Sequence, residues 1–416
     1  MASAEQRFDI VIVGAGAVGA CLAIALAELG YTVALIEKSP IINHHQPAFD
    51  ERHLAFSRST RLALEGLGLW EQMAAAATQV THIHVTSRGR FGSVMLDAQE
   101  EGLDALGHVL PARVIGEVLY LRIESTSGIT VLAPTQITDM FVADDHVYVS
   151  VQHKQTETHL HANLLIGADG ADSMVRKLFG IDASTWKYDQ SAVITNIEVD
   201  SLKPGLAFER FVDDGALAML PRGDNSYAVV CSISDEQADE LMGMSEPELI
   251  AWLQGIMGDY LSPIRKAGKC SRYPLALVRA GETVRHRLVL IGNAAHFLHP
   301  VAAQGFNLSM RDVAALTDVL QQAKANNKDP GDLDILSEYA KWRQQDEKTT
   351  IAFTDGLIRL FTNPLLPISM LRQGGMLGLR YIPALRHLFT QVVSGRTGRQ
   401  PALTRGVSLI NNWPGE

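Results

Sequence analysis

The feature that most constrains the fold is a charge-free apolar stretch, Ile10 to Ala27, in which three glycines recur at fixed spacing. The stretch is nearly long enough to span a bilayer. However, Asp9 precedes it, where a signal peptide would have basic residues. Its first part overlaps a β-branched run, Phe8 to Val13, that is typical of a central parallel strand. We therefore interpret the stretch as a buried strand, a glycine turn and a buried helix, in preference to a transmembrane segment.

The glycine turn belongs to a complete strand–helix–strand unit. Gly14 permits a tight turn, Gly16 lets a phosphate approach the backbone, and Gly19 lets the helix pack closely on the strand. The second strand, Tyr31 to Ile36, ends at Glu37, whose carboxylate can accept hydrogen bonds from ribose hydroxyls and repels a 2′-phosphate. The unit predicts a dinucleotide site for FAD or NAD. The alternative is a buried helix that merely contains glycines.

Two further motifs follow predicted strands later in the chain. The first is Gly167-Ala168-Asp169-Gly170, whose acid would by itself be explained as a turn former. The second runs from Gly292-Asn293 to Gln304-Gly305-Phe306-Asn307, at the start of a long predicted helix from Phe306 to Ala325. A helix start stabilises nearby negative charge by up to ~2 kcal/mol. The N–H groups of residues 305–307 would therefore meet the negative pyrimidine ring of a reduced flavin.

Between the parallel-type strands lie segments that alternate like half-exposed strands and are joined by short polar turns. These segments are Val80 to Leu96, Val193 to Val199, Ala207 to Val212, Leu217 to Leu220, Tyr227 to Ile233 and Cys270 to Val278. The pattern predicts an α/β fold. It consists of a doubly wound, Rossmann-like FAD-binding layer, an inserted antiparallel β-sheet that forms a substrate domain, and a C-terminal helical segment.

We expect six consecutive parts along the chain. The FAD-binding layer takes residues 1–79, 105–185 and 281–355, the substrate domain takes 80–104 and 186–280, and the basic helical segment takes 356–416.

Charge and composition exclude several classes of function. The 416 residues have a net charge of −10, which argues against a general nucleic-acid binder. The three cysteines are far apart, which fits a reducing compartment and argues against a disulfide framework. The paired histidines have no third ligand that can be placed, so we predict no metal site. These pairs are His44-His45, His82 with His84, and His159 with His161.

The three glycine-bearing motifs, in this order and with these gaps, resemble the flavin-dependent aromatic hydroxylases of the para-hydroxybenzoate hydroxylase fold. Within that group the chain is similar to the ubiquinone-biosynthesis hydroxylases, over about residues 8 to 365. Supporting segments are Phe49-Asp50-Glu51-Arg52, Ala207-Phe208-Glu209-Arg210-Phe211, Leu217-Ala218-Met219-Leu220-Pro221 and Tyr273-Pro274-Leu275-Ala276-Leu277. The chain departs from the family pattern where Asn293 replaces the usual Asp, where Ala303 and Ser309 replace common glycines, and where Ala216 replaces a frequent Pro.

The resemblance implies a set of cofactor-binding residues. The ADP half of FAD would be held at Gly14, Ala15, Gly16, Ala17, Gly19, Glu37 and Lys38. Arg52 would contact the flavin side and Arg113 would assist. Asp169 would face the pyrophosphate, and Asn293 the ribityl–pyrophosphate region. The isoalloxazine would be edged by Pro300, Gln304, Gly305, Phe306 and Asn307.

The resemblance also implies an activity. NAD(P)H would reduce FAD, and one oxygen atom of O₂ would pass to the ring of a polyprenylated phenol, 2-polyprenyl-6-methoxyphenol, to give the 1,4-benzoquinol. The ring would lie against a sheet bearing Phe208, Arg210, Phe211 and Met219, and no side chain is identified as an acid–base catalyst. Three alternatives stay open: a hydroxylase for another ring position in the same pathway, an epoxidase or saturase of isoprenoid lipids, and a non-catalytic prenyl-binding protein.

The C-terminal segment, 356–416, is basic. It has seven arginines and a single acid, Glu416, giving +6 against −16 for the rest of the chain. Short amphipathic helices with basic edges can lie on an anionic bilayer, where each Arg contributes about 1 kcal/mol. We therefore expect a cytoplasmic enzyme that is peripheral to the inner face of the membrane. The resemblance also implies other ubiquinone-biosynthesis proteins as partners. The alternative is a helical cover over the FAD layer with a solvated arginine face.

Overall fold

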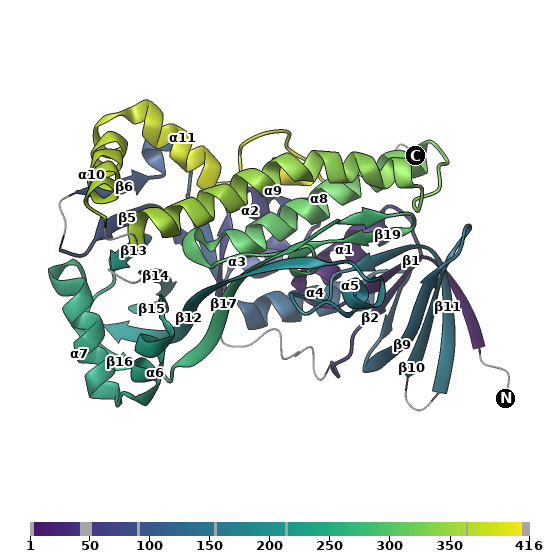
Figure 1. The fold of residues 1–416 in the computed structure, drawn as a ribbon, viewed down its shortest axis with the longest axis horizontal. Helices are drawn as coiled ribbons and strands as arrows, with labels where there is room; N and C mark the ends of the chain where they lie inside the picture. Colours follow the sequence, from purple (N-terminus) through teal and green to yellow (C-terminus); the bar gives the residue numbers. More distant parts are fainter. Residues whose placement is uncertain are drawn as a thin grey trace.

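In the described part of the chain, three β-sheets are joined by two long helices and surrounded by shorter ones (Figure 1). The computed structural model describes residues 4–41, 52–89, 92–153, 156–212, 215–362 and 365–409. Residues 49–51 of one family-like segment, the His44-His45 pair and residues 213–214 lie outside these ranges.

The first sheet is the doubly wound one. Strand β1 (Ala4–Val13) lies at its centre and pairs in parallel with β2 (Val33–Ile36) and β11 (Thr156–Gly167). In register, Val13 lies opposite both Ile36 and Gly167, so the turns that follow these strands meet at one edge of the sheet. The remaining strands are β8 (Ile129–Leu132), β9 (Thr135–Val142), β10 (Val147–His153), β18 (Val284–Arg285) and β19 (Leu288–Leu290).

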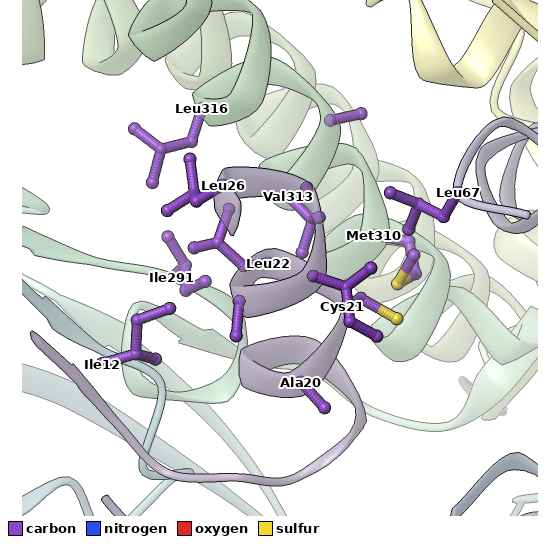
Figure 2. Close-up of a cluster of buried hydrophobic side chains, with 14 of the residues drawn as sticks. Ile12, Ala20, Cys21, Leu22, Leu26, Leu67, Ile291, Met310, Val313 and Leu316 are labelled. Atoms are coloured by element: carbon purple, nitrogen blue, oxygen red, sulfur yellow. The ribbon is translucent and has the colours of Figure 1, made fainter. Parts of the chain in front are cut away.

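Helix α1 (Ala17–Glu28) is buried on nearly all sides, which explains its uninterrupted apolar sequence. Figure 2 shows its side chains Leu22 and Leu26 between Ile12 and Ile291 of the sheet region and Val313 and Leu316 of helix α8 (Gln304–Ala325). The apolar stretch near the start of the chain is therefore a strand, a turn and a core helix, as predicted. Within the described ranges, no helix is long and apolar enough to cross a membrane.

The second sheet is largely antiparallel and follows the order β20-β17-β12-β15-β14-β13-β5-β6, with β16 beside β12. Its strands are β5 (His82–Ser87), β6 (Ser93–Asp97), β12 (Ala183–Val199), β13 (Leu206–Val212), β14 (Gly215–Gly223), β15 (Ser226–Ser234), β16 (Ile264–Ala267), β17 (Ser271–Ala280) and β20 (His296–Phe297). One face packs against α6 (Asp235–Gly243) and α7 (Glu246–Met257).

A small third sheet connects the two layers through β3 (His53–Ser57), β7 (Gly107–Pro111) and β4 (Thr78–Val80). The shorter helices are α2 (Arg58–Gly66), α3 (Trp70–Ala74), α4 (Ala112–Ser125) and α5 (Met174–Leu178). Single 3₁₀ turns lie at Gln99–Glu101, Gly258–Tyr260, Gly292–Ala294, Val301–Ala303 and Leu403–Arg405.

Helix α9 (Leu333–Thr362) runs beside α8 from the first sheet to the second (Figure 1). At its far end, α10 (Leu366–Tyr381) and α11 (Pro383–Val393) form a helical pair next to β6. The observed layers confirm the predicted α/β fold with an inserted antiparallel sheet and a C-terminal helical segment.

Candidate functional site

Two of the three glycines around the turn before α1, Gly14 and Gly19, leave no room for a side chain. Gly14 has φ +102°, and a Cβ there would lie 2.5 Å from the Ala168 carbonyl oxygen. A Cβ on Gly19 would lie 1.9 Å from the Gly14 oxygen. At Gly16, by contrast, a Cβ would meet nothing within 4 Å. The two outer glycines therefore allow close packing, while the middle one faces open space at the start of the helix.

The start of α1 is available to an anionic ligand. No side chain caps it at Gly16, and its first turn contains no acidic residue. Glu37 is held beside it, because its carboxylate accepts hydrogen bonds from the N–H groups of Ala15 (3.0 Å) and Ser39 (2.9 Å). Lys38 lines the same space. Ala15 and Gly19 do not line it and shape it only through their backbone and packing.

Asp169 lies at the same edge of the first sheet. One carboxylate oxygen accepts hydrogen bonds from the N–H groups of Met174 (2.6 Å) and Val175 (3.1 Å), which fixes the start of α5. The other oxygen, Oδ1, is buried and has no hydrogen-bond partner in the described part of the chain. A buried acceptor of this kind is usually paired. The side chain is thus a turn former and also offers an acceptor to a bound group.

The third motif is fixed by a buried ionic network. Asp312 accepts hydrogen bonds from His296 Nε2 (2.6 Å), Arg343 Nε (2.7 Å) and the Gly292 N–H (3.0 Å). Burial alone would raise the pKa of Asp312, but His296 and Arg343 outweigh it and hold that pKa well below its usual range. Asn293, on the turn that this network holds, is exposed and lines the open space.

The entry to α8 forms a second uncapped helix start. Ala302 (φ +57°) and Ala303 (φ +51°) both adopt the left-handed conformation, which alanine rarely takes, and no side chain caps the helix. A Cβ on Gly305 would meet nothing within 4 Å, so the first turn of α8 faces open space. Pro300 and Phe306 line the same space.

Asn307 holds this loop in place. Its Oδ1 accepts hydrogen bonds from the Ser57 N–H (2.8 Å) and the Thr60 hydroxyl (2.7 Å), and its Nδ2 donates to the oxygens of Ala303 (2.7 Å) and Ala55 (3.1 Å). These bonds use the full capacity of an amide. Gln304 likewise donates to the Ala302 and Val393 oxygens, both at 3.0 Å. Both side chains bind the protein itself and would contribute to a ligand site by position.

A single cavity of about 1650 Å³ joins both helix starts to the second sheet and to α9, α10 and α11. This volume exceeds the roughly 300–1,000 Å³ of a site for one drug-sized ligand. Its nucleotide end is polar, with Glu37, Lys38, Arg52 and Asp169. The end at α9 to α11 is apolar and is lined by side chains such as Leu357, Leu360, Phe361, Met376, Leu379 and Phe389. The cavity therefore has room for a dinucleotide and a hydrophobic substrate together.

The structure places two of the predicted substrate contacts away from the cavity wall that β13 and β14 form. Phe208 and Phe211 line the cavity, but Arg210 and Met219 do not. Arg210 points to the opposite face, where it donates a hydrogen bond to the Thr86 hydroxyl (3.0 Å) and lies over the Tyr260 ring. Met219 is buried in the core beneath α6 and α7. Alternation along β13 puts Arg210 on the face opposite Phe211, and alternation along β14 puts Met219 on the face opposite the cavity. Phe208 shares the face of Arg210 and packs in the core beneath α6 and α7, from where it still contributes to the cavity lining.

A predicted cofactor contact is also displaced. Arg113 is exposed in the first turn of α4, where it is ion-paired with Glu117 (2.7 Å) and lies away from the cavity. Its neighbour Ala112 lines the cavity instead, because successive helix positions face different directions. Arg52 does line the cavity, and its guanidinium lies over the Tyr273 ring at 5.2 Å.

Glu209 is a cavity residue that the sequence reasoning did not single out. It lies on β13 between Ala207 and Phe211, on the face that lines the cavity. Burial raises the pKa of its carboxyl group to about 7. The signal that could have found it is the alternation of the segment Ala207 to Phe211, which places residues 207, 209 and 211 on one face.

These observations fit FAD. A flavin dinucleotide needs a close backbone approach and free N–H groups at its phosphates, which the open space at Gly16 and the uncapped start of α1 supply. It also needs an acceptor for its ribose, which Glu37 supplies, and donors at its flavin ring, which the uncapped start of α8 supplies. The orphaned Oδ1 of Asp169 provides one further unmet partner.

Comparison with known proteins points the same way. Residues 7–354 match the family model described as an FAD binding domain. Ubiquinone hydroxylase UbiL of Rhodospirillum rubrum is 33% identical over 411 residues, which are 98% of this chain and 95% of that protein. The 3-demethoxyubiquinol 3-hydroxylase of Escherichia coli is 30% identical over 380 residues, which are 90% of this chain and 95% of that protein.

A solved structure supports the fold. The p-nitrophenol 4-monooxygenase PnpA of Pseudomonas putida superimposes with a TM-score of 0.76 at 18% identity, covering 94% of this chain and 100% of that one.

Proposed function

The chain belongs to the FAD-binding-domain family and is a flavin-dependent hydroxylase of the ubiquinone-biosynthesis type, and on this premise we propose that it hydroxylates 2-polyprenyl-6-methoxyphenol to the 1,4-benzoquinol. The observation that carries the proposal is the continuity of one cavity from the nucleotide turn to an apolar chamber. FAD, reduced by NAD(P)H, supplies the activation of O₂ when bound. One O₂, one NAD(P)H and one proton would be consumed for each quinol and water formed.

The chain's own residues would position the reactants and exclude water. The α1 start and Glu37 would hold the ADP half, and Asn293 and Asp169 would lie along the pyrophosphate and ribityl region. The N–H groups at the start of α8 would stabilise negative charge on the reduced ring. The apolar walls from β13, β14 and α9 would enclose the phenol ring and keep water from it.

The test is product analysis with the purified holoenzyme. 2-Farnesyl-6-methoxyphenol serves as the probe, with NAD(P)H and isotopically labelled O₂. We expect a quinol that carries one labelled oxygen at the ring. Hydroxylation at another ring position would favour the neighbouring step of the pathway, and oxidation of the farnesyl alkene would favour an isoprenoid epoxidase. A colourless protein that takes up no FAD would overturn the proposal in favour of a prenyl-binding protein.

We further propose that α10 and α11 rest on an anionic membrane, from which the prenylated substrate enters. Their outer faces expose large apolar side chains, including Met370 (65%), Leu371 (69%) and Tyr381 (70%). Leu385 and Leu388 are both exposed and part of the cavity lining, so the apolar interior continues to this surface.

The arginines of this segment are only partly available to lipid. Arg372 is buried and donates hydrogen bonds to backbone oxygens of α9, Arg386 pairs with Glu100 (2.9 Å), and Arg399 lies over the Trp342 ring. Arg380 lies over the ring of Tyr381, at the end of α10. Attachment would therefore depend mainly on the apolar surface, with a smaller electrostatic contribution.

Vesicle flotation tests this surface. Removing 356–416 would cut through α9, so the better variant is Met370→Ser with Leu371→Ser. We expect the double variant to lose most binding to vesicles that contain phosphatidylglycerol. The control is Leu121→Ser, which alters an exposed apolar side chain on α4. Equal flotation of the double variant and the wild type would remove the proposal.

A further inference from the structure

Glu209 is the carboxylate on the cavity wall of the second sheet. Its direct neighbours across the sheet are Val85 of β5 and Ala218 of β14, and the next residues outward are Val94 and Val230. All four line the cavity. The carboxylate therefore lies within an apolar patch of sheet, where an unpaired charged group is costly.

The described part of the chain offers this carboxylate no partner. Within the described ranges, no hydrogen bond or ion pair reaches Glu209, although it is partly buried. Buried carboxylates that serve only the fold are normally paired, as Asp312 is with His296 and Arg343. A polar side chain that is directed into a cavity without a partner points to a ligand that supplies one.

The charged and titratable groups around the cavity do not neutralise Glu209. The residues of β5, β14 and α9 that line the cavity are apolar. On α10, Arg372 faces the cavity with its guanidinium bonded to the Phe361 oxygen (2.5 Å). From the small sheet, His108 faces it with a pKa lowered to about 4 by burial and by Arg61, and His53 accepts a hydrogen bond from Arg222 (2.9 Å).

We propose that Glu209 binds the hydroxyl group of the phenolic substrate and accepts its proton as the ring is hydroxylated. The proposal rests on the proposed function, because it needs a phenol in the apolar chamber. A phenol supplies what the site lacks, since its O–H is a donor for the carboxylate and its ring and prenyl tail suit the apolar walls. An epoxidase substrate, which is an alkene, would leave the carboxylate unpaired.

In the proposed reaction, Glu209 takes the phenol proton and later returns it. The phenol O–H proton moves to the Glu209 carboxylate, and the oxygen lone pair forms a C=O bond. The displaced ring electron pair then forms the new C–O bond with an oxygen atom derived from O₂. The ring carbon next loses its hydrogen as a proton, the ring becomes aromatic again, and Glu209 returns its proton to the first oxygen. The other oxygen atom leaves as water, with both electrons supplied by NAD(P)H.

The first experiment compares a phenol with its methyl ether. 2-Farnesyl-6-methoxyphenol and its O-methyl ether are titrated into the holoenzyme, and binding is followed by the change in flavin absorbance. Because a hydrogen bond to a charged group is strong, we expect wild type to prefer the phenol by about 10- to 100-fold. Glu209→Gln, which keeps the shape but loses the charge, should reduce this preference to a few-fold.

The second experiment measures coupling and its pH dependence. In Glu209→Gln we expect NAD(P)H oxidation with the phenol to continue, but with most of the reducing equivalents released as hydrogen peroxide. In wild type, kcat/KM for the phenol should fall below about pH 7, since the pKa of Glu209 is raised to about 7 by burial. That acidic limb should vanish in Glu209→Gln and return in Glu209→Asp.

The control is Glu198→Gln, an exposed carboxylate on β12 of the same sheet that lies near Lys266. It should match wild type in all these measurements. If wild type hydroxylates the phenol and Glu209→Gln, with full flavin content, keeps the same preference, coupling and pH profile, the role of Glu209 is wrong. If Glu209→Gln does not fold, the wild-type protein still tests the role of Glu209: equal affinity for the phenol and its methyl ether would overturn that role. If wild type does not turn over the phenol, the proposed function fails.

Discussion

The two ends of the cavity are shaped by different parts of the protein. At the nucleotide end, the shape comes from backbone: Gly14 and Gly19 touch neighbouring carbonyl groups, and Glu37 is held by two N–H groups. At the apolar end, the shape comes from side chains on one face of β13 and β14 and on α9 to α11, which are far apart in the chain. We therefore expect the nucleotide end to tolerate substitution at Gly14 and Gly19 less well than the apolar end tolerates exchanges between apolar side chains.

Polar groups also behave differently at the two ends. Near the start of α8, the side chains of Asp312 and Asn307 have all or most of their hydrogen-bonding capacity used by the protein. Glu209 at the apolar end has no described partner. A group that is fully paired holds the framework, while a group left unpaired in a cavity is placed for a ligand. This contrast leads to four predictions, from the largest expected effect to the smallest.

Removing the paired acid should produce the largest effect. Asp312→Ala leaves His296 buried without its acidic partner and leaves Arg343 with Asp346 as its remaining ion-pair partner, and should lower the free energy of unfolding by about 3–5 kcal/mol. Urea denaturation measures the change, with Asp145→Ala as the control, an exposed acid whose removal should leave the unfolding midpoint close to that of wild type. Because the folded-state pKa of Asp312 is depressed, its stabilisation is present above about pH 4 and is lost below it. Similar stabilities of both variants would contradict a structural role for the network.

The glycine turn should separate packing from phosphate binding. Gly19→Ala places a Cβ against the Gly14 oxygen and should lower the free energy of unfolding by about 3 kcal/mol, even without FAD. Gly16→Ala meets open space, so the stability of the apoprotein should change by less than about 0.5 kcal/mol. Its Cβ occupies the space assigned to phosphate, however, so FAD affinity should fall. Thermal unfolding of the apoproteins and flavin titration measure the two effects. An FAD affinity unchanged in Gly16→Ala would place the phosphates elsewhere.

Replacing the unpaired acid, Glu209, should raise the free energy of unfolding instead of lowering it. Burial raises the pKa of Glu209 from 4.5 to about 7, so its charged form destabilises the substrate-free fold. Stability from this residue is therefore lost as pH rises from about 4.5 to 7. Glu209→Gln should raise the free energy of unfolding by about 2 kcal/mol at pH 8, after screening by water in the cavity, and by less than about 1 kcal/mol at pH 5. Denaturant titrations at both pH values measure this. A destabilised variant at pH 8 would show that the carboxylate is paired.

The smallest effect should come from replacing Arg113, a predicted cofactor contact that lies away from the cavity. Arg113→Gln removes an exposed ion pair with Glu117, which is worth at most about 0.5 kcal/mol. Flavin content and affinity should be unchanged, because this side chain lies away from the cavity. Flavin absorbance of the purified variant, with Glu117→Gln as the matched control, tests it. A colourless Arg113→Gln protein would restore the contact that the resemblance implied.

The nucleotide end could be predicted from sequence because its determinants are local. The strand before Gly14, the spacing to Gly19 and the acid after the second strand are all defined within 30 residues of chain. The same holds for the α8 entry, where Pro300 and residues 304–307 lie close together in sequence. The hydrogen-bond partners of Asn307 and Gln304 could not be predicted from the sequence, because Ala55, Ser57 and Val393 lie far away from them along the chain.

The sequence by itself determined the α/β fold and the nucleotide turn, because glycine conformations, strand ends and helix starts are short-range properties of the backbone. Tertiary structure decided which side chains form the substrate chamber. It placed Glu209 in the cavity and Arg210 and Met219 outside it, and it brought α10 and α11 against β6 and the far end of α9. The physical reason is that the direction of a side chain is set by the face of the element, while its surroundings are set by elements far away in the chain.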